Sequence, residues 1–185
     1  MDGAYRTPLG DVPIDSACAD ALRARCPFLS LDETWQRGEH AVEVVLPFLQ
    51  RLAPANLSVV SVLIGSEDAA EWTQFSDALA QMILMQEEPV LVIASSDLSQ
   101  YLPAPETVER DRLLIEAIGT LNVTIFTRAV HAQTVPVCGA AAIACWLGTV
   151  TRLGATTATL AAYGTSAEVG GDPHSAIGYA GLTAR

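Results

Sequence analysis

The sequence lacks any stripe of basic residues. Its 185 residues include 10 that are lysine or arginine and 21 that are aspartate or glutamate, so the formal net charge is −11. Nucleic acids and anionic membrane surfaces are recognised through clusters of lysine and arginine. We therefore expect neither nucleic acid nor a membrane as a partner, and the acidity itself indicates little beyond solubility.

Cysteine pairs with the spacing of metal ligands are also missing. The four cysteines are Cys18, Cys26, Cys138 and Cys145, and none belongs to a Cys-x-x-Cys motif, which argues against a structural zinc site. The first residues, MDGAYRTPLGD, contain no apolar signal region. The uncharged stretch 135–150 is too short to cross a bilayer and predicts a buried loop and helix. We expect a cytoplasmic location with reduced thiols.

Apolar residues make up half of the sequence, as is typical of an α/β domain with buried strands. Apolar runs predict strands over 57–64, 90–94, 156–163 and 176–183. Capping residues and helical spacing predict helices over 15–25, 39–52, 106–118 and 138–152, and another that Ser66 caps. Because strands alternate with helices, we predict one α/β domain over residues 1–185, with a mostly parallel sheet flanked by helices on both faces.

The first candidate for chemistry is the segment Glu39-His40-Ala41-Val42-Glu43. On a helix, His40 and Glu43 would share a face because they lie three positions apart. A histidine beside a carboxylate can transfer protons or hold a metal. The alternative is an exposed helix start that carries ordinary polar residues.

The second candidate is the segment Ser95 to Tyr101, which has the sequence SSDLSQY and directly follows the predicted strand 90–94. The carboxyl ends of strands line the ligand crevice of open α/β sheets. Hydroxyls, the carboxylate of Asp97 and the amide of Gln100 would gather there. The alternative is a turn into a helix, since serine and aspartate are good capping residues.

Two further candidates lie in the second half of the chain. Cys138 stands just before or within the first turn of a predicted helix, where the helix dipole favours a thiolate. Its alternative is a small buried cysteine that packs beside Gly139. The loop from Gly164 to Asp172 has small residues that could cradle an anion, although it has neither phosphate-loop spacing nor a lysine.

These segments, taken in order, resemble the Memo family, the "AmmeMemoRadiSam system protein B" proteins. The resemblance spans nearly the whole chain and rests on TPLG (7–10), EHAVEVVLPFLQ (39–50), SSDLSQY (95–101), CG (138–139), YGTSAEVGGD (163–172) and IGYA (177–180). It implies a fold similar to class III extradiol dioxygenases, which are non-haem iron enzymes. It also implies association with radical SAM and AMMECR-type proteins.

The resemblance implies a pocket made by two histidines from an N-terminal region, the cysteine of the CG motif and a histidine in SSD-x-SH. Cys138 matches the metal-ligand cysteine, and His40, Glu43 and Asp97 match pocket positions. This chain departs from the pattern in two ways that bear on the chemistry. It begins at the TPLG loop, so the segment with both ligand histidines is absent, and Gln100 replaces the histidine. Ala41 also replaces the usual serine.

An amide cannot take a proton near neutral pH, so Gln100 removes the acid/base group that the family would use. We therefore predict a non-catalytic binding or scaffold module with a degenerate metal pocket and no cofactor. The alternative is a metal-dependent oxidoreductase of the dioxygenase type, using iron or another divalent metal. A third interpretation places the natural start upstream of Met1.

Two structural expectations accompany this prediction. A retained site would bring the side chains of His40, Asp97 and Cys138 into one cleft at the carboxyl end of the strand 90–94. A sheet edge left bare by a shortened N-terminus would favour self-association into a homo-oligomer.

Overall fold

A computed structural model describes residues 3–53, 56–133 and 137–185 of the chain. Its helices are α1 (Ser16–Arg25), α2 (Glu33–Arg37), α3 (Leu46–Leu52), α4 (Ala69–Leu84), α5 (Ala104–Gly119), α6 (Val123–His131) and α7 (Ala140–Arg152), with a short 3-10 turn η1 (Ser166–Val169). Its strands are β1 (Ala4–Thr7), β2 (Gly10–Pro13), β3 (Ala158–Thr165) and β4 (Gly178–Ala184). The fold is therefore mixed α/β.

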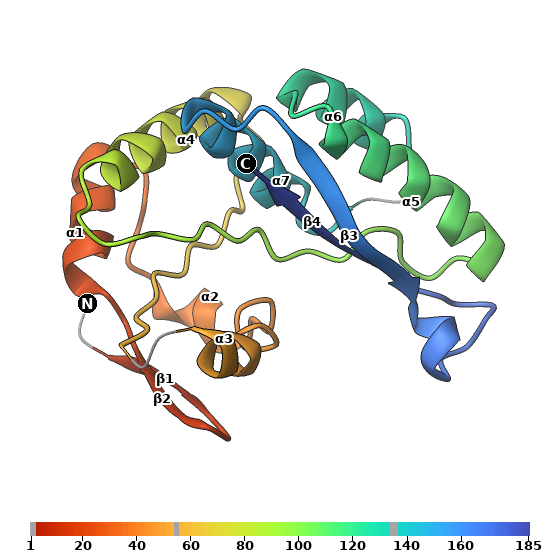
Figure 1. The fold of residues 1–185 in the computed structure, drawn as a ribbon, viewed down its shortest axis with the longest axis horizontal. Helices are drawn as coiled ribbons and strands as arrows, with labels where there is room; N and C mark the ends of the chain where they lie inside the picture. Colours follow the sequence, from red (N-terminus) through yellow and green to blue (C-terminus); the bar gives the residue numbers. More distant parts are fainter. Residues whose placement is uncertain (1–2, 54–55, 134–136) are drawn as a thin grey trace.

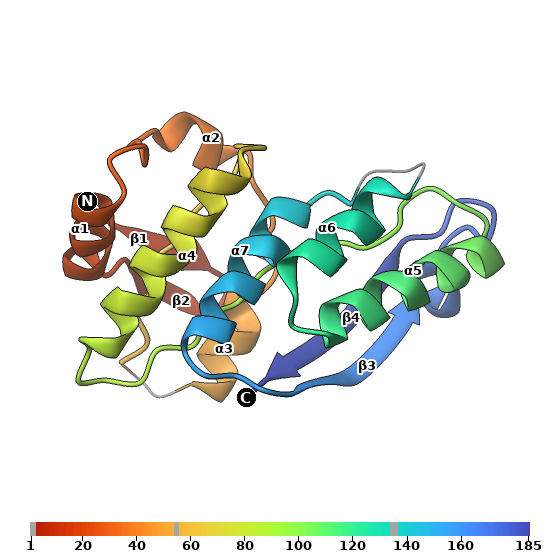
Figure 2. The ribbon, with the colours of Figure 1, turned by 90° about the horizontal axis from the view of Figure 1, so that it is seen from above.

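The longer helices lie together on one side of the extended parts of the chain. Figure 1 shows α4, α7, α6 and α5 above the β3–β4 hairpin and above the extended stretch that leads out of α4. Seen from above, α4 and α7 lie side by side at the centre, with α1 on one flank and α5 and α6 on the other (Figure 2). The short elements β1, β2, α2 and α3 gather below α1 and α4 (Figure 1).

Two clusters of buried apolar side chains hold this arrangement together. The first core cluster is Leu98, Leu114, Ala117, Ile118, Phe126, Val137, Ile143, Ala144 and Leu147. The second core cluster is Leu22, Cys26, Phe75, Ala78, Met82 and Cys145. Helix α7 supplies residues to both clusters, and Trp72 of α4 packs against both. The two halves of the molecule are therefore joined through the α4–α7 pair.

The sheet differs from the one that the sequence predicts. Within the described residues, strand pairing is limited to two antiparallel hairpins, β1–β2 and β3–β4, and two isolated bridges. The β3–β4 hairpin confirms the strands predicted over 156–163 and 176–183, but their pairing is antiparallel. Segments 57–64 and 90–94 are extended without a ladder. The described residues do not show a mostly parallel sheet, because the pairing of these two segments there is limited to one parallel bridge between Val59 and Ile14.

Several helices begin and end close to where the sequence predicts them. Asp15 caps α1 by accepting a hydrogen bond from the N–H of Cys18 at 2.9 Å. Asp68, two residues beyond the expected Ser66, caps α4. The predicted helix 39–52 was too long, because residues 41–45 form turns and α3 starts at Leu46 with Pro47 in its first turn. Proline suits that position, where its missing N–H is not needed.

The apolar stretch 135–150 lies partly outside the description, since residues 135 and 136 are not among the described residues. Its described part enters α7, as the sequence predicts. Among the described residues, no helix combines the length and the hydrophobicity that crossing a membrane requires.

Candidate functional site

The segment 39–43 lies on the surface, in the turns before α3. The Glu39 carboxylate accepts hydrogen bonds from the backbone N–H groups of His40 and Ala41, both at 2.8 Å. The His40 side chain is 79% exposed, with its Nδ1 3.7 Å from Oε1 of Glu39. Glu43 is also exposed. Because no helix forms over these residues, the shared helical face predicted for His40 and Glu43 is absent.

The segment Ser95 to Tyr101, called the SSD segment below, contacts two other motifs through its two serines. Ser95 donates from Oγ to the carbonyl oxygen of Ala41 at 2.7 Å. Ser96 accepts at Oγ from the backbone N–H of Gly139 at 2.8 Å and donates to the carbonyl oxygen of Asp97. Segments that are far apart in the sequence therefore meet at Ser95 and Ser96.

The close packing around Gly139 explains why the CG motif has a glycine. A Cβ at this position would lie 2.5 Å from Cβ and 2.6 Å from Oγ of Ser96, closer than unbonded atoms approach. Only a residue without a side chain lets the start of α7 lie this close to the SSD segment. Cys138 stands just before that helix, as predicted, and its side chain is exposed.

Asp97 and Gln100 are paired with each other. The half-buried carboxylate of Asp97 accepts a hydrogen bond at Oδ2 from Nε2 of Gln100 at 2.8 Å. Tyr101 follows with a positive φ of 59° and lies exposed. Burial raises the pKa of Tyr179 in β4, and the negative charge of Asp97 raises it further. Tyr179 is thus an additional neighbour of Asp97, and the IGYA motif was the signal that could have identified it.

Beneath this segment lies a buried carboxylate that the sequence analysis missed. Asp111 of α5 is fully buried. It accepts from the backbone N–H of Ser99 and from the hydroxyl of Tyr163, both at 2.8 Å. Burial and this hydrogen bond raise the pKa of Tyr163, so the phenol stays a donor. Nothing in the helical pattern around Asp111 distinguishes it from a surface residue, because its partners come from distant segments.

Gly178 of β4 lies directly against Asp111. A Cβ on Gly178 would overlap the Asp111 carboxylate. The backbone of Gly178 exchanges hydrogen bonds with the SSD segment: its carbonyl accepts from Leu98 at 3.1 Å and its N–H donates to Ser99 at 2.9 Å. Two backbone hydrogen bonds therefore hold the IGYA motif beside the SSD segment.

The loop Gly164 to Asp172 satisfies its own polar groups. Thr165 and Glu168 form a reciprocal capping box at η1. Ser166 accepts at Oγ from the N–H of Ile177 at 3.0 Å and donates its backbone N–H to the carbonyl of the same residue at 2.9 Å. These groups stabilise the turn into β4, and the anion-binding role proposed for this loop stays a prediction.

The candidate metal ligands are not joined to one another. In residues 3–53, 56–133 and 137–185, no hydrogen bond or ion pair links the side chains of His40, Asp97 and Cys138. Within the same ranges no three histidine, cysteine or acidic side chains lie close enough to hold one metal ion. The structure brings the three backbone segments together, and convergence of the three side chains in one cleft remains a prediction.

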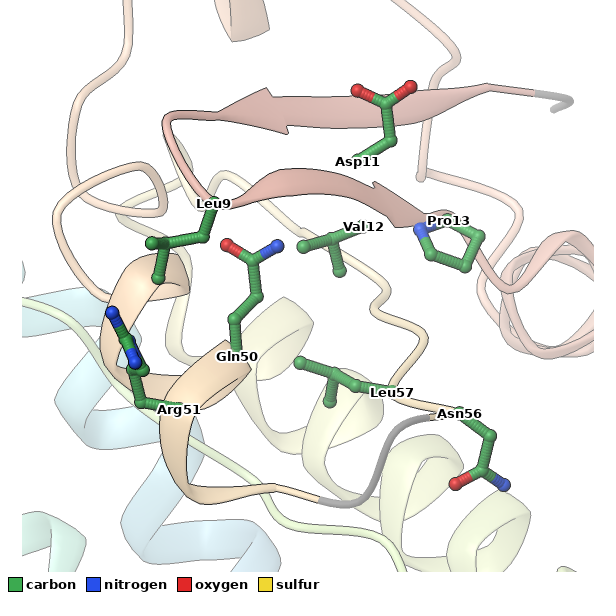
Figure 3. Close-up of a pocket in the computed structure, with 8 residues that line it drawn as sticks. All are labelled: Leu9, Asp11, Val12, Pro13, Gln50, Arg51, Asn56 and Leu57. Atoms are coloured by element: carbon green, nitrogen blue, oxygen red, sulfur yellow. The ribbon is translucent and has the colours of Figure 1, made fainter.

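An open cavity of about 700 Å³ lies on another part of the surface. Figure 3 shows its lining, which comes from the β1–β2 hairpin, α3 and the residues that follow α3. Gln50 links two motifs at its edge, because its Nε2 donates to the carbonyl oxygen of Gly10 at 3.2 Å and its Oε1 accepts from Thr7. The TPLG turn is therefore held on the last residues of the LPFLQ motif.

Comparison with known proteins agrees with these motifs. The model of the Memo-like protein family matches residues 1–183. The chain is 34% identical over 184 residues to a MEMO1 family protein of Methanopyrus kandleri, covering all of this chain and 65% of that protein. It is 33% identical to one of Methanocaldococcus jannaschii and 33% identical to one of Methanosarcina barkeri, covering 97% and 96% of this chain and 64% and 66% of those proteins.

The match extends over almost all of this chain but over somewhat less than two thirds of the first two relatives. The segments that resemble the family in sequence are also those that the structure places in contact, through Ser95 with Ala41, Ser96 with Gly139 and Ser99 with Gly178. The chain belongs to the Memo-like protein family.

Proposed function

We propose that the protein is a non-catalytic binding or scaffold module of the Memo-like family, with a degenerate metal pocket. The observation that carries this proposal is the hydrogen bond from Nε2 of Gln100 to Oδ2 of Asp97. An amide at this position neither accepts nor releases a proton at neutral pH. It also engages Oδ2, one of the two oxygens of the carboxylate that a metal or a substrate would otherwise use.

The other candidate ligands support the same proposal. A non-haem iron oxygenase uses two histidines and one carboxylate on one face of the metal. Here the His40 ring is mostly exposed and has Glu39 as its charged neighbour, and Cys138 is a single exposed thiol. The residues present do not fit the ligand set that the family resemblance implies.

One observation favours the alternative, a metal-dependent oxidoreductase with a dioxygenase-like fold and a mostly parallel sheet. The segments that carry His40, Asp97 and Cys138 do meet, through the hydrogen bonds of Ser95 and Ser96. Under this alternative, a rearrangement of the exposed His40 and Cys138 side chains would complete the ligand set. Radical SAM and AMMECR-type proteins are the partners that we propose under either function, and the cytoplasm is the proposed location.

Metal content tests the proposal most directly. Protein purified without added metal should carry well under one equivalent of iron, copper or zinc by elemental analysis. Cys138→Ala should leave that content unchanged, and Cys18→Ala is the matched control because Cys18 lies in α1, outside the motifs. Stoichiometric metal that is lost in Cys138→Ala and kept in Cys18→Ala would support the alternative instead.

Turnover gives a second test. After anaerobic loading with ferrous iron and exposure to oxygen, the protein should not open the ring of catechol-type substrates. Gln100→His returns an imidazole to the position next to Asp97 and is the informative variant. Ring-opened product from the unmodified protein would overturn the proposal, whereas product from Gln100→His alone would show that the amide is what removes the activity.

A further inference from the structure

The carboxylate of Asp97 has no positively charged partner among the described residues. It is half-buried, and the hydrogen bond that it accepts there comes from the neutral amide of Gln100. The ion pairs of the described residues do not include it. Taking a carboxylate partly out of water costs free energy, which a nearby cation offsets. One negative charge at this site is therefore left uncompensated by the described part of the chain.

The pair formed by Asp97 and Gln100 offers hydrogen-bond acceptors. A carboxylate can only accept, so Gln100 gives its amino group to Oδ2 of Asp97 and keeps its own carbonyl oxygen Oε1 as an acceptor. Within the part of the chain that the structure describes, neither Oε1 of Gln100 nor Oδ1 of Asp97 takes part in another hydrogen bond. Two acceptor oxygens are thus available to a ligand that donates several N–H groups.

Two tyrosine side chains accompany this pair. Gly178 donates its backbone N–H to the carbonyl of Ser99 at 2.9 Å, which brings β4 and its Tyr179 beside the SSD segment. Burial raises the pKa of Tyr179, and the charges of Asp97 and Tyr101 raise it further, so both groups lie near its phenol. Tyr179 is 45% exposed and Tyr101 is 70% exposed. Solvent therefore reaches two aromatic rings near the uncompensated carboxylate.

The backbone holds Tyr101 in an unfavourable conformation. Its φ of 59° lies in the left-handed region, which residues with a side chain seldom adopt. Strain of this kind persists where the surrounding structure fixes it, and it gathers at binding sites. Here the bridge between Leu102 and Ala176, closed by a hydrogen bond of 2.7 Å, fixes the next residue of the chain. The fold thus maintains an exposed ring at a conformational cost.

Taken together, these features match the chemistry of a guanidinium group. This cation is planar, donates through five N–H groups, accepts none and stacks on aromatic rings. A lysine ammonium would pair with the carboxylate but would neither stack nor reach two acceptors in one plane. An anion is opposed by the carboxylate and by the net charge of −11 on the chain, which attracts cations.

We infer that the guanidinium group of an arginine side chain on a partner polypeptide binds at four residues, Asp97, Gln100, Tyr101 and Tyr179. The guanidinium donates to Oδ1 of Asp97 and Oε1 of Gln100, and the tyrosine rings lie against its faces. A polypeptide is the source because the rings are exposed, whereas free small ligands bind in pockets that enclose them. The inference rests on the proposed binding function, since a metal on Asp97 would exclude the guanidinium.

Nuclear magnetic resonance of tyrosine rings labelled with carbon-13 is the test. The sequence has four tyrosines, and the probe is the capped peptide acetyl-Gly-Gly-Arg-Gly-Gly-amide. The signals of Tyr101 and Tyr179 should shift as it is added, while those of Tyr5 and Tyr163, which are hydrogen-bonded elsewhere, should not.

Two related peptides test the chemistry of the ligand. A citrulline peptide, which has the same shape without the charge, should bind at least about 10-fold more weakly. A lysine peptide should bind about 5-fold more weakly, because its ammonium neither stacks nor forks. Free L-arginine should also bind at least about 3-fold more weakly, because it lacks the main chain that extends over the exposed rings.

Substitutions test the residues. Asp97→Asn keeps the shape of the side chain and removes its charge, so binding of the arginine peptide should fall at least about 10-fold. Tyr101→Leu should weaken binding about 5-fold, whereas Tyr101→Phe keeps the ring and should bind like the parent. Glu109→Gln in α5 is the matched control for the loss of one exposed charge. Trp35→Leu in α2 is the control for the loss of an exposed ring, and circular dichroism checks that each variant folds.

Three outcomes would overturn the inference. The first is the absence of shifts at Tyr101 and Tyr179 up to about 10 mM peptide. The second is equal binding of the arginine and citrulline peptides, which would mean that the charge is not recognised. The third is free L-arginine that binds as tightly as the peptide, which would make the ligand a free small molecule. Each of these would leave the proposed non-catalytic function standing, because metal content and turnover test that function separately.

Discussion

Two pairs of segments in this chain look alike in sequence and differ in structure. The strands β3 and β4 pair with each other in register from Ala158–Ala184 to Thr165–Gly178, with one irregularity between Leu160 and Ala162. Segments 57–64 and 90–94 are at least as apolar, yet they remain extended and largely unpaired. The difference is the partner. The β3–β4 hairpin brings its own neighbouring strand through the connection 166–177, whereas the pairing of the other two segments within the described residues is limited to the bridge between Val59 and Ile14.

The β3–β4 hairpin and the segment 90–94 also differ in the side-chain hydrogen bonds that hold them to the helices. The β3–β4 hairpin is locked to α5 by the Asp111 carboxylate, which bonds Tyr163 of β3 and the backbone of Ser99. The segment 90–94 has one side chain bond to its backbone, from Trp146. We therefore expect substitutions around the hairpin to cost far more stability than substitutions in segments 57–64 and 90–94.

The largest effect should come from Gly178→Ala. The new methyl group would overlap the Asp111 carboxylate and push the hairpin away from α5, at a cost of about 3 kcal/mol in the free energy of unfolding. Gly181→Ala is the control on the same strand, since a Cβ there meets nothing within 4 Å. Urea denaturation measures both, and equal stabilities would show that the hairpin is as loosely held as segments 57–64 and 90–94.

A comparable loss should follow Leu114→Ala in the first core cluster. Leu114 is fully buried, so truncating it removes apolar contacts and leaves a cavity, at a cost of about 3 kcal/mol. Thermal and urea denaturation should agree on this value if unfolding is two-state. A loss below about 1 kcal/mol would mean that the core around α5 relaxes to fill the space.

Tyr163→Phe should cost less, about 1 kcal/mol, because it removes one hydrogen bond to Asp111. Its pH dependence gives the sharper test. The pKa of Tyr163 is raised by burial first and by Asp111 second, so the folded state holds the phenol proton more tightly than the unfolded state. The stability from this proton is fully present below about pH 10, the ordinary tyrosine value, and is lost as the pH rises beyond it.

The difference in stability between the parent and Tyr163→Phe should therefore be constant from neutral pH to about pH 9 and should shrink above pH 10. Denaturation at a series of pH values measures it. A difference that grows with alkalinity would contradict the bonded arrangement of Tyr163 and Asp111. Tyr101→Phe, at an exposed tyrosine, is the control for general alkaline effects.

The smallest effect should come from Leu91→Ala, within about 0.5 kcal/mol of the parent. The Leu91 side chain is mostly exposed and its removal leaves no cavity. The same type of substitution at Leu114 makes the comparison direct. If Leu91→Ala destabilised the isolated chain as much as Leu114→Ala, the 90–94 segment would be buried in solution and the two pairs of segments would not differ.

The parts of the fold that the sequence predicts are those that local interactions specify. Helices α1, α5 and α7 agree with the predicted ranges to within a few residues. The core positions of α4 also follow its helical spacing, with Phe75 and Met82 buried. The helices α2 and α6 and the β1–β2 hairpin were missed because they are short, and short elements have weak periodic signals.

The candidate site shows the same division. Its motifs were recognised along the sequence, and the structure adds which backbone groups join them, such as the contact between Ser96 and Gly139. The burial of Asp111 could not be predicted, because it depends on a tyrosine and a glycine that are 52 and 67 positions away. The parallel sheet was predicted from apolar runs that say nothing about which strand lies next to them.

The position of helix α7 between the two core clusters has a consequence for local unfolding. Because Cys145 belongs to the second core cluster and Ile143, Ala144 and Leu147 belong to the first, neither cluster can come apart without uncovering one side of this helix. Local unfolding of either half should therefore propagate through α7 into the other, which makes it the cooperative centre of the chain. The slowest-exchanging amides should lie in α7. The CG motif directly precedes this helix, so local unfolding of either half should also affect the motif.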